Sequence, residues 1–528
     1  MPNAWCCPAS PSPPPSGSDP MRPSRVAGAA FAGLALAAPV SAETLRDALL
    51  KAYQTNPTIT GQRANLRAVD ENVPLARANG LPSVSATGGY TENVLVPNAS
   101  SSNTLSNPAR LAQGTTQLSV PIFQGGAVRN AVRGAETRVE AGQAQLRGTE
   151  AQLFTSVVGA YMDVIRDEAI VGLNGQNVRV LEVNLNASRD RFQVGDLTRT
   201  DVAQSEARLA QARAQLQSAE AQLISSRENY IRFVGDAPTD LQPPPPLPNL
   251  PKSPADAVAE ALRENPTLLA AGKQRDATRF DIDVARASRL PRLNVVVGGN
   301  YFNYLGALGA GTNIKPGQSG QSANVGLALT VPLFQGGRPA AQVRQAEALR
   351  SQAIENVTAA ERQVIAQTRS AFAIYRSSQQ VIASAETAVS ANKLSLEGVR
   401  AENSVGTRTI LDILNAEQEL LNSQVTLVTA RRDAYVAGFA LLAAMGDAEA
   451  RDLNLEGASL YDPTLNFKRV RNRFNDFGGD GEPGPVATST AQTPAQDATV
   501  RRPLDPVLES GVDRSPALTT GASAPSRQ

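Results

Sequence analysis

The sequence of 528 residues contains no histidine, two cysteines and one tryptophan. Cys6, Cys7 and Trp5 all lie within the first 20 residues. The remainder of the chain therefore has no imidazole base, no thiolate nucleophile, no disulfide framework and no soft metal site. It also has no glycine-rich phosphate-binding loop. We therefore expect a protein that is not an enzyme and that binds no cofactor or metal.

Excess charge and long apolar runs are also missing. The formal net charge is +1, so there is no overall basic field and we expect no nucleic-acid partner. After residue 42 no run of about 20 apolar residues occurs, which is the length that a membrane-spanning helix needs. Any membrane role would have to come from strands.

The N-terminal region has the layout of a secretory signal peptide that starts at Met21. A positively charged segment is followed by an apolar one and then by the small-residue cleavage site Val40-Ser41-Ala42. We interpret residues 21–42 as the signal peptide and residues 1–20 as an extension from a misassigned start codon. A lipid-modified Cys6 or Cys7 is the alternative for that extension.

The mature chain is an internal duplication. Residues 120–126, VPIFQGG, recur 211 positions later as residues 331–337, VPLFQGG. In each copy an apolar pattern of period two changes into a helical one, and the proline and the paired glycines fit a hinge from a strand into a helix. The predicted hinge residues are Pro121, Gly125, Gly126, Pro332, Gly336 and Gly337.

The periodicities predict the same order of elements in both repeats. We expect helices at 43–79, 127–192, 198–234, 255–288, 339–402 and 408–445, and strands at 83–95, 114–123, 294–304 and 322–334. The longest helices would span roughly 100 Å, and the half-length helices would stack beside them. The predicted organisation is a first repeat at 43–241, a proline-rich connector at 242–254, a second repeat at 255–446, an irregular segment at 447–475 and a disordered tail at 476–528.

Each predicted strand has one apolar face and the length of a tilted strand that crosses a bilayer. Four such strands cannot close a barrel in a membrane, so several copies must assemble. Two copies would give a barrel filled by side chains, whereas three would give twelve strands around an open duct. The predicted fold class is therefore mixed: a long α-helical barrel continued by a transmembrane β-barrel in a homotrimer.

The sequence resembles the TolC family of outer-membrane efflux and secretion channels over about residues 43–473. The two hinges and residues 405–415, VGTRTILDILN, carry the resemblance. It implies a passive exit duct in the outer membrane, with its helices and tail in the periplasm. The implied partners are outer-membrane lipid, a periplasmic adaptor, and an ABC or proton-driven transporter of the inner membrane.

The resemblance also implies a gate at the helix tips, where an arginine binds a Thr-Asp pair of a neighbouring helix above rings of acidic residues. Asn403 replaces a family tyrosine and Asn415 replaces the second acidic ring. The gate positions are Thr200, Asp201, Asn403, Arg408, Asp412 and Asn415. The tips themselves, implied to dock the adaptor, contain Val194, Gly195, Val405 and Gly406.

Simpler interpretations remain open. The Val-Gly pairs fit helical hairpin turns whose second helix is capped by Thr198 or Thr407. Arg408 and Asp412 also have the spacing of an ordinary surface ion pair on a helix. A soluble periplasmic adaptor is the main alternative from another class of protein. Whether the cargo is a secreted protein or small toxic molecules is not encoded in any recognisable pocket.

Overall fold

The computed structural model describes residues 43–94, 110–306, 317–453, 455 and 460–509. The predicted signal peptide and N-terminal extension lie outside the described residues, as do parts of both hairpin loops and the end of the tail. The first repeat contains α1 (Leu45–Thr55), α2 (Pro57–Asp70), α3 (Asn72–Ala78), β1 (Ser83–Glu92), β2 (Arg110–Phe123), α4 (Ala127–Gln193) and α5 (Arg199–Val234). The second contains α6 (Pro254–Glu264), α7 (Pro266–Ala287), β3 (Arg292–Asn303), β4 (Ser319–Thr330), α8 (Arg338–Ser404) and α9 (Ile410–Met445), and α10 (Thr464–Val470) follows.

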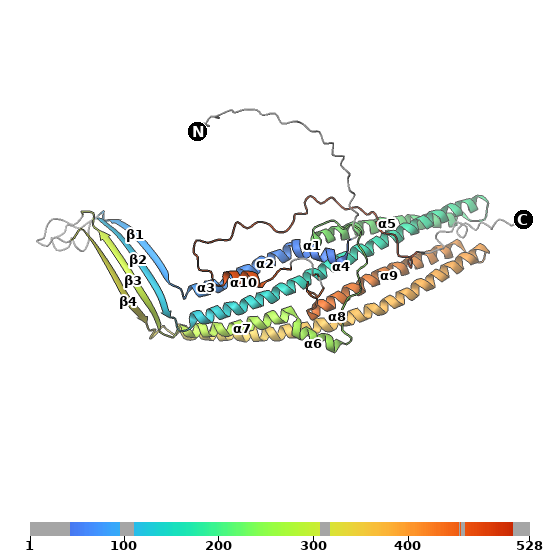
Figure 1. Cartoon of the computed structure of the whole chain (residues 1–528). Coiled ribbons are helices and arrows are strands. Elements are labelled where there is room, and N and C mark those ends of the chain that lie inside the picture. The colour runs from blue at the N-terminus through green and yellow to red at the C-terminus, as the bar shows by residue number, and fades with distance from the viewer. Residues whose placement is uncertain (1–42, 95–109, 307–316, 454, 456–459, 510–528) are drawn as a thin grey trace, which may run out of the picture. The chain divides into compact units, whose positions relative to one another are not determined.

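The helices form four columns that lie side by side (Figure 1). The continuous helices α4 and α8 are 67 residues long, and α5 and α9 are 36 residues long. Helix α4 packs against α1, α2, α3 and α5 of its own repeat and against α7 and α9 of the other. Helix α8 packs against α6, α7 and α9. Half-length helices therefore stack beside each continuous one, as their lengths predict.

The helix predicted at 43–79 is divided into three in the structure. Asn56 adopts an extended conformation, and its side chain accepts a hydrogen bond from the N–H of Thr58 at 2.8 Å. Pro57 then occupies the first turn of α2, where its missing N–H is tolerated. The same break recurs at Asn265 and separates α6 from α7. The prediction was wrong at these sites because each Asn-Pro pair caps a new helix instead of disturbing a continuous one.

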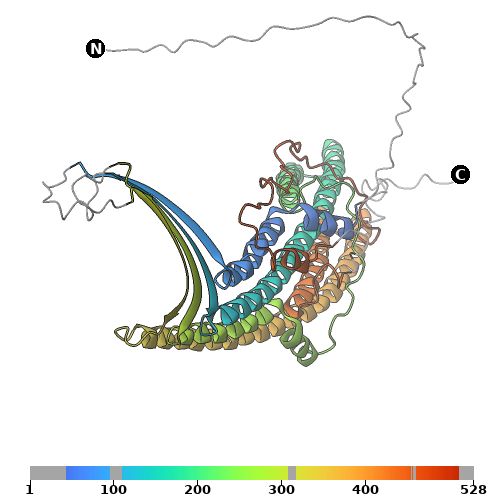
Figure 2. The same ribbon diagram turned by 60° about the vertical axis from the view of Figure 1, so that its left-hand side comes forward.

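The four strands form one antiparallel sheet in the order β1-β2-β3-β4, so β1 and β4 are its edges. Figures 1 and 2 show that none of the helices in the described residues covers either face of this sheet. One row across all four strands consists of Val84, Leu118, Val297 and Val325. The neighbouring row consists of Ser85, Gln117, Gly298 and Asn324. Because adjacent rows point to opposite faces, one face of the sheet is apolar and the other polar here.

The second hinge lies outside the sheet. Strand β4 ends at Thr330, although the alternation of residues predicted a strand to Phe334. Pro332 cannot donate a ladder hydrogen bond, and β4 is an edge strand that pairs only with β3 in the part of the chain that the structure describes. In the first repeat β2 continues through Pro121 to Phe123, because β3 pairs with it there across a register shift.

The tail predicted to be disordered is packed against the helices as far as Glu509. Leu508 is buried, and the backbone carbonyls of Asp497 and Thr499 accept hydrogen bonds from Arg227 of α5. Low apolar content predicted disorder, but residues 496–509 have partners on the helices, whereas Phe477, Val486 and most other residues before 496 are exposed. The irregular segment at 447–475 likewise contains the short helix α10.

Candidate gate at the helix tips

Two equivalent turns form the helix tips, one joining α4 to α5 and the other joining α8 to α9. Gly195 and Gly406 have φ angles of 84° and 83°, a left-handed conformation that favours glycine. Their N–H groups donate to the carbonyls of Phe192 and Asn403, each at 3.0 Å. The Val-Gly pairs are thus C-terminal caps of the two long helices, and the duplication has preserved this geometry.

Each half-length helix begins with a capping box. Thr198 and Asp201 exchange hydrogen bonds at 2.9 and 3.3 Å between side chain and backbone. The hydroxyl of Thr198 also donates to the carboxylate of Asp201 at 2.7 Å, and this bond, together with that from the N–H of Thr198, holds the pKa of Asp201 below its usual range. Thr409 and Asp412 do the same, and the pKa of Asp412 is likewise lowered by the backbone and side-chain hydrogen bonds of Thr409. Thr409, not Thr407, therefore caps α9. The hydroxyl of Thr407 instead donates to the carbonyl of Glu402 at 2.9 Å.

An ion pair closes each turn. In the second turn Nε of Arg408 donates to Oε2 of Glu402 at 2.7 Å, and both side chains are about half exposed. The side-chain amide of Asn403 donates to the carbonyl of Arg408 at 2.7 Å and fixes the backbone there. In the first turn the signs are exchanged, because Arg191 of α4 donates to Asp196 at 2.7 Å.

The predicted gate residues do not all meet within one chain. Asp201 is engaged by Thr198, and Thr200 is an exposed residue in the first turn of α5. Asn415 lies further along α9, where its side-chain oxygen accepts a hydrogen bond from Arg208 of α5 at 2.9 Å. Arg208, Glu402, Arg191 and Asp196 were not singled out from the sequence, because none of them belongs to a repeated motif.

A deeper pair ties α8 to α9 below the second turn. Arg400 donates a hydrogen bond to Glu417, and both side chains are buried. Their counterparts 211 positions earlier are Arg189 and Glu206, which form an exposed pair at 2.7 Å. The recurrence of both residues at the repeat offset is the sequence signal that would have identified this pair.

The tips also expose apolar side chains. Val194 and Val405 rank among the most exposed valines of the described residues. One largely exposed valine therefore lies at the end of each hairpin.

The two hinges use the same backbone turn. Gly126 and Gly337 each have a φ of 81° and precede the first residue of α4 and α8. The N–H groups of Ala127 and Arg338 both donate, at 3.1 Å, to the carbonyl three residues earlier. Gly125 and Gly336 also have positive φ angles, of 62° and 59°. The positive φ angles of both glycines in each turn favour glycine at these positions.

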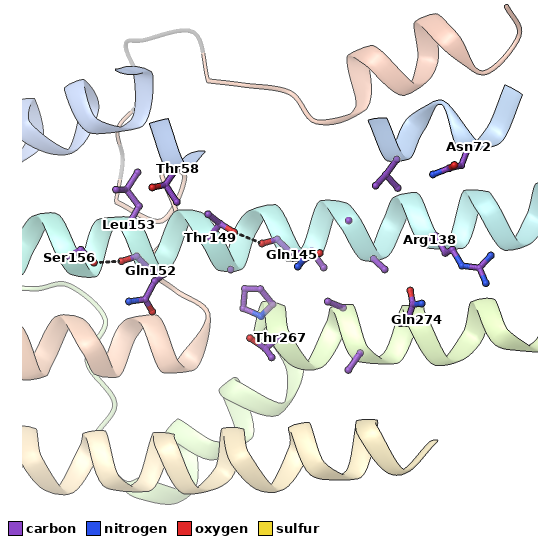
Figure 3. Close-up of a pocket in the computed structure, with 18 of the residues that line it drawn as sticks. Thr58, Asn72, Arg138, Gln145, Thr149, Gln152, Leu153, Ser156, Thr267 and Gln274 are labelled. Carbon is purple, nitrogen blue, oxygen red and sulfur yellow. Dashed lines mark hydrogen bonds between the residues drawn. The ribbon is translucent and has the colours of Figure 1, made fainter. Parts of the chain in front are cut away.

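A cavity of about 790 Å³ lies along α4 between α2, α3 and α7 (Figure 3). Its labelled lining residues are mostly neutral threonine, glutamine and serine side chains, and none of the predicted tip or hinge residues lines it.

Within the described ranges, no group of three or more histidine, cysteine or acidic residues is placed to hold a metal ion. No helix in that same part of the chain is long and apolar enough to cross a bilayer.

This arrangement of paired helical hairpins continued by a small sheet is the fold of outer-membrane channels. The Campylobacter jejuni CmeC outer membrane channel aligns with a TM-score of 0.67 over 81% of this chain and 89% of that chain, at 16% sequence identity. In sequence, the chain is 33% identical over 434 residues to the outer membrane efflux protein BepC of Brucella suis, covering 82% of this chain and 91% of BepC. It is 27% identical over 425 residues to the outer membrane protein TolC of Vibrio cholerae, covering 79% of this chain and 94% of that protein.

The profile of the outer membrane efflux protein family matches residues 48–235 and 257–447. The chain therefore belongs to the outer membrane efflux protein family. This confirms the resemblance to the TolC family, and both repeats are included in the match. The protein is an outer-membrane channel of the efflux and secretion class, so the alternative of a soluble adaptor is rejected.

Proposed function

We propose that three copies of this chain assemble into a tube with a twelve-stranded barrel in the outer membrane and a helical barrel below it. The observation that carries this proposal is the open four-stranded sheet, which has one apolar and one polar face. Strands β1 and β4 have free edges, and the exposed fractions of Val84 and Val325 in the apolar row are 70% and 77%. Pairing β4 of one copy with β1 of the next would satisfy both edges and turn the apolar row toward lipid.

The helices support the same assembly. Among the described residues, no further helical column packs on the outer side of α8, yet this helix exposes the large apolar side chains of Leu349, Ile374 and Leu394. The column formed by α5 and α1–α3 is at the opposite end of the set. A neighbouring copy that covers α8 would bury these side chains and continue the wall of helices. Twelve strands rather than eight leave room for a duct lined by the polar rows.

The helix tips form the gate in this proposal. In the assembled tube Arg408 would leave Glu402, its partner in the single chain, and contact Thr200 and Asp201 of a neighbouring helix. The exchange is feasible because the Arg408–Glu402 pair is exposed, and exposed pairs contribute little. Asp412 lines the constriction, with Asn403 and Asn415 in the remaining gate positions. Val194 and Val405, held out by Gly195 and Gly406, would dock a periplasmic adaptor.

The duct is passive, and cargo choice belongs to its partners. An ABC exporter or a proton-driven pump of the inner membrane would deliver a secreted protein or small toxic molecules through the adaptor. The 790 Å³ cavity along α4 is lined mostly by neutral residues, so it offers little charge by which one of these classes would be selected.

Neighbouring residues on β4 provide the test. Val325→Arg places a charge in the apolar row, where a cation at the bilayer midplane costs about 2 to 4 kcal/mol. Asn324→Arg places the same charge in the polar row. We expect Val325→Arg to reduce outer-membrane insertion strongly, and Asn324→Arg to insert, form channels in planar lipid bilayers and shift ion selectivity toward anions. Equal insertion of both variants, or no conductance from the parent protein, would refute the proposal.

A further inference from the structure

Residues 496–509, which we name the C-terminal strap, lie across all four helical columns. The N–H of Gln496 donates to Glu228 of α5 at 3.2 Å. The side chain of Leu504 lies against Gly172 of α4, where an added Cβ would be 3.0 Å from it. Asp505 then pairs with Arg431 of α9 at 2.9 Å. The strap finally reaches Lys393 of α8, so it connects the hairpin of the first repeat to that of the second.

The first anchor of the strap is a buried arginine. Arg227 of α5 has an exposed fraction of 0% and forms an ion pair with Glu168 of α4. Its guanidinium also donates to the carbonyl of Asp497 at 2.7 Å, to the carboxylate of Asp497 at 3.0 Å, and to the carbonyl of Thr499 at 2.8 Å. A fixed guanidinium fork that meets two strap carbonyls specifies both position and direction of the strap.

The second anchor lies on the other hairpin. Leu508 has an exposed fraction of 3% and belongs to a core cluster that includes Leu181 of α4 and Leu427 of α9. Its carbonyl accepts a hydrogen bond from the side chain of Gln424 of α9 at 2.7 Å. The ammonium group of Lys393 donates to the carbonyls of Val507 and Glu509 at 2.6 and 2.8 Å. The end of the strap is therefore held by α8 and α9 together.

These anchors have a mechanical consequence. Widening a tube of helical columns requires neighbouring columns to move relative to one another. Helices α4 and α9 already touch, and α5 touches α9. The strap adds a connection between α5 and α8, which belong to columns that are not adjacent. Any displacement of the α8–α9 hairpin from the α4–α5 hairpin must therefore break the contacts of Leu508 or of Arg227.

We propose that the C-terminal strap is an autoinhibitory element that clamps the two hairpins together and keeps the tips closed until it is released. This inference rests on the proposed channel function. It assigns a role to a segment whose composition predicted only disorder.

The first test removes residues 496–528 from the full-length protein. We expect assembled channels whose mean single-channel conductance in planar lipid bilayers is at least threefold that of the parent. Parental conductance in an intact assembly would overturn the clamp. If the parent itself does not conduct, the proposed channel function fails instead, and the two failures are therefore distinguishable.

A matched pair of variants keeps the test valid if the deletion impairs assembly. Leu508→Asp places a charge in the buried anchor, whereas Val507→Asp places the same charge on a side chain with an exposed fraction of 51%. We expect raised conductance for Leu508→Asp and parental conductance for Val507→Asp. Equal conductance of the two variants would overturn the proposal.

A disulfide trap tests the position of the strap directly. Both native cysteines lie in the first 20 residues, so the double variant Gly172→Cys, Leu504→Cys introduces the only pair in the rest of the chain. We expect an intramolecular crosslink under oxidising conditions in native membranes. Failure of the crosslink to form in native membranes would contradict a strap docked on α4.

Discussion

Arg400 donates a hydrogen bond to Glu417 across the α8–α9 hairpin, and the exposed fractions of the two side chains are only 2% and 7%. The equivalent pair of the first repeat, Arg189 with Glu206, is about half exposed. The duplication thus preserved the two residues while their surroundings diverged. An exposed ion pair contributes little to stability. In the buried pair, by contrast, each charge is compensated by the other, so the loss of one partner is costly.

Removing one partner should therefore have unequal effects in the two repeats. Glu417→Ala leaves the charge of Arg400 buried, and we expect a loss of about 3 to 5 kcal/mol in the free energy of unfolding. Glu206→Ala, the matched control, should cost less than about 1 kcal/mol. Thermal unfolding followed by circular dichroism measures both. Similar losses would mean that the buried pair is compensated by other contacts.

Burial of Glu150 on α4 raises the pKa of its carboxyl from 4.5 to about 7, and the nearby carboxylate of Glu449 adds to the effect. The folded protein then binds this proton more tightly than the unfolded chain, so its contribution to stability is present below pH 4.5 and declines as the pH rises to about 7. Arg63 and the N–H of Ala450 partly offset the rise.

Glu150→Gln removes this titration and can retain the hydrogen bond from Ala450. We expect the variant to be more stable than the parent at pH 8, by on the order of 2 kcal/mol, and to lose this advantage at pH 4.5. Thermal unfolding at the two pH values measures the difference. An advantage that is independent of pH would show that the carboxyl titrates normally.

The two hinges should tolerate a methyl group differently. Gly125→Ala and Gly336→Ala both place alanine at a positive φ, which costs about 1 to 2 kcal/mol. At Gly125 the added Cβ would also lie 2.9 Å from Cβ of Leu290, whereas at Gly336 it meets nothing within 4 Å. We expect Gly125→Ala to be the more destabilising by a further 1 to 3 kcal/mol. Denaturation of both variants in detergent measures this, and an equal loss would argue against the close contact with Leu290.

The gate assignment predicts a gain of conductance. Arg408→Ala and Asp201→Ala should leave the assembly intact and raise single-channel conductance in planar bilayers, because each removes one partner of the proposed contact between neighbouring helices. Glu402→Ala is the control, since Glu402 binds Arg408 within its own chain and is not a partner in the proposed contact between neighbouring helices. Unchanged conductance of the first two variants would remove these residues from the gate.

Much of this architecture could be predicted from periodicity. The helices α4 and α8 begin and end within about two residues of the positions expected from the sequence. The tip and hinge glycines could be identified because they recur at equivalent positions of both repeats. In the structure each of them has a positive φ, a conformation that favours glycine. The break at Asn56 was not predicted, because the helical pattern of residues 43–79 continues across Pro57, whereas the side chain of Asn56 caps a new helix there.

Long-range partners could not be predicted in this way. The contacts of Arg227 with Asp497 and of Gln424 with Leu508 join segments that no repeat or period relates. The tail contains too few apolar residues to predict order by itself, and its order depends on anchors that exist only once the helices have packed. The contact between Arg208 and Asn415 could not be predicted either, because the two residues lie on different hairpins.

The number of copies in the detergent-extracted particle tests the central claim most directly, because the described part of one chain leaves the outer edges of β1 and β4 without a partner strand. Native mass spectrometry of the mature protein, extracted from outer membranes, measures that number. The account predicts a particle of three chains that requires detergent to remain in solution. A single chain that is soluble without detergent would contradict it.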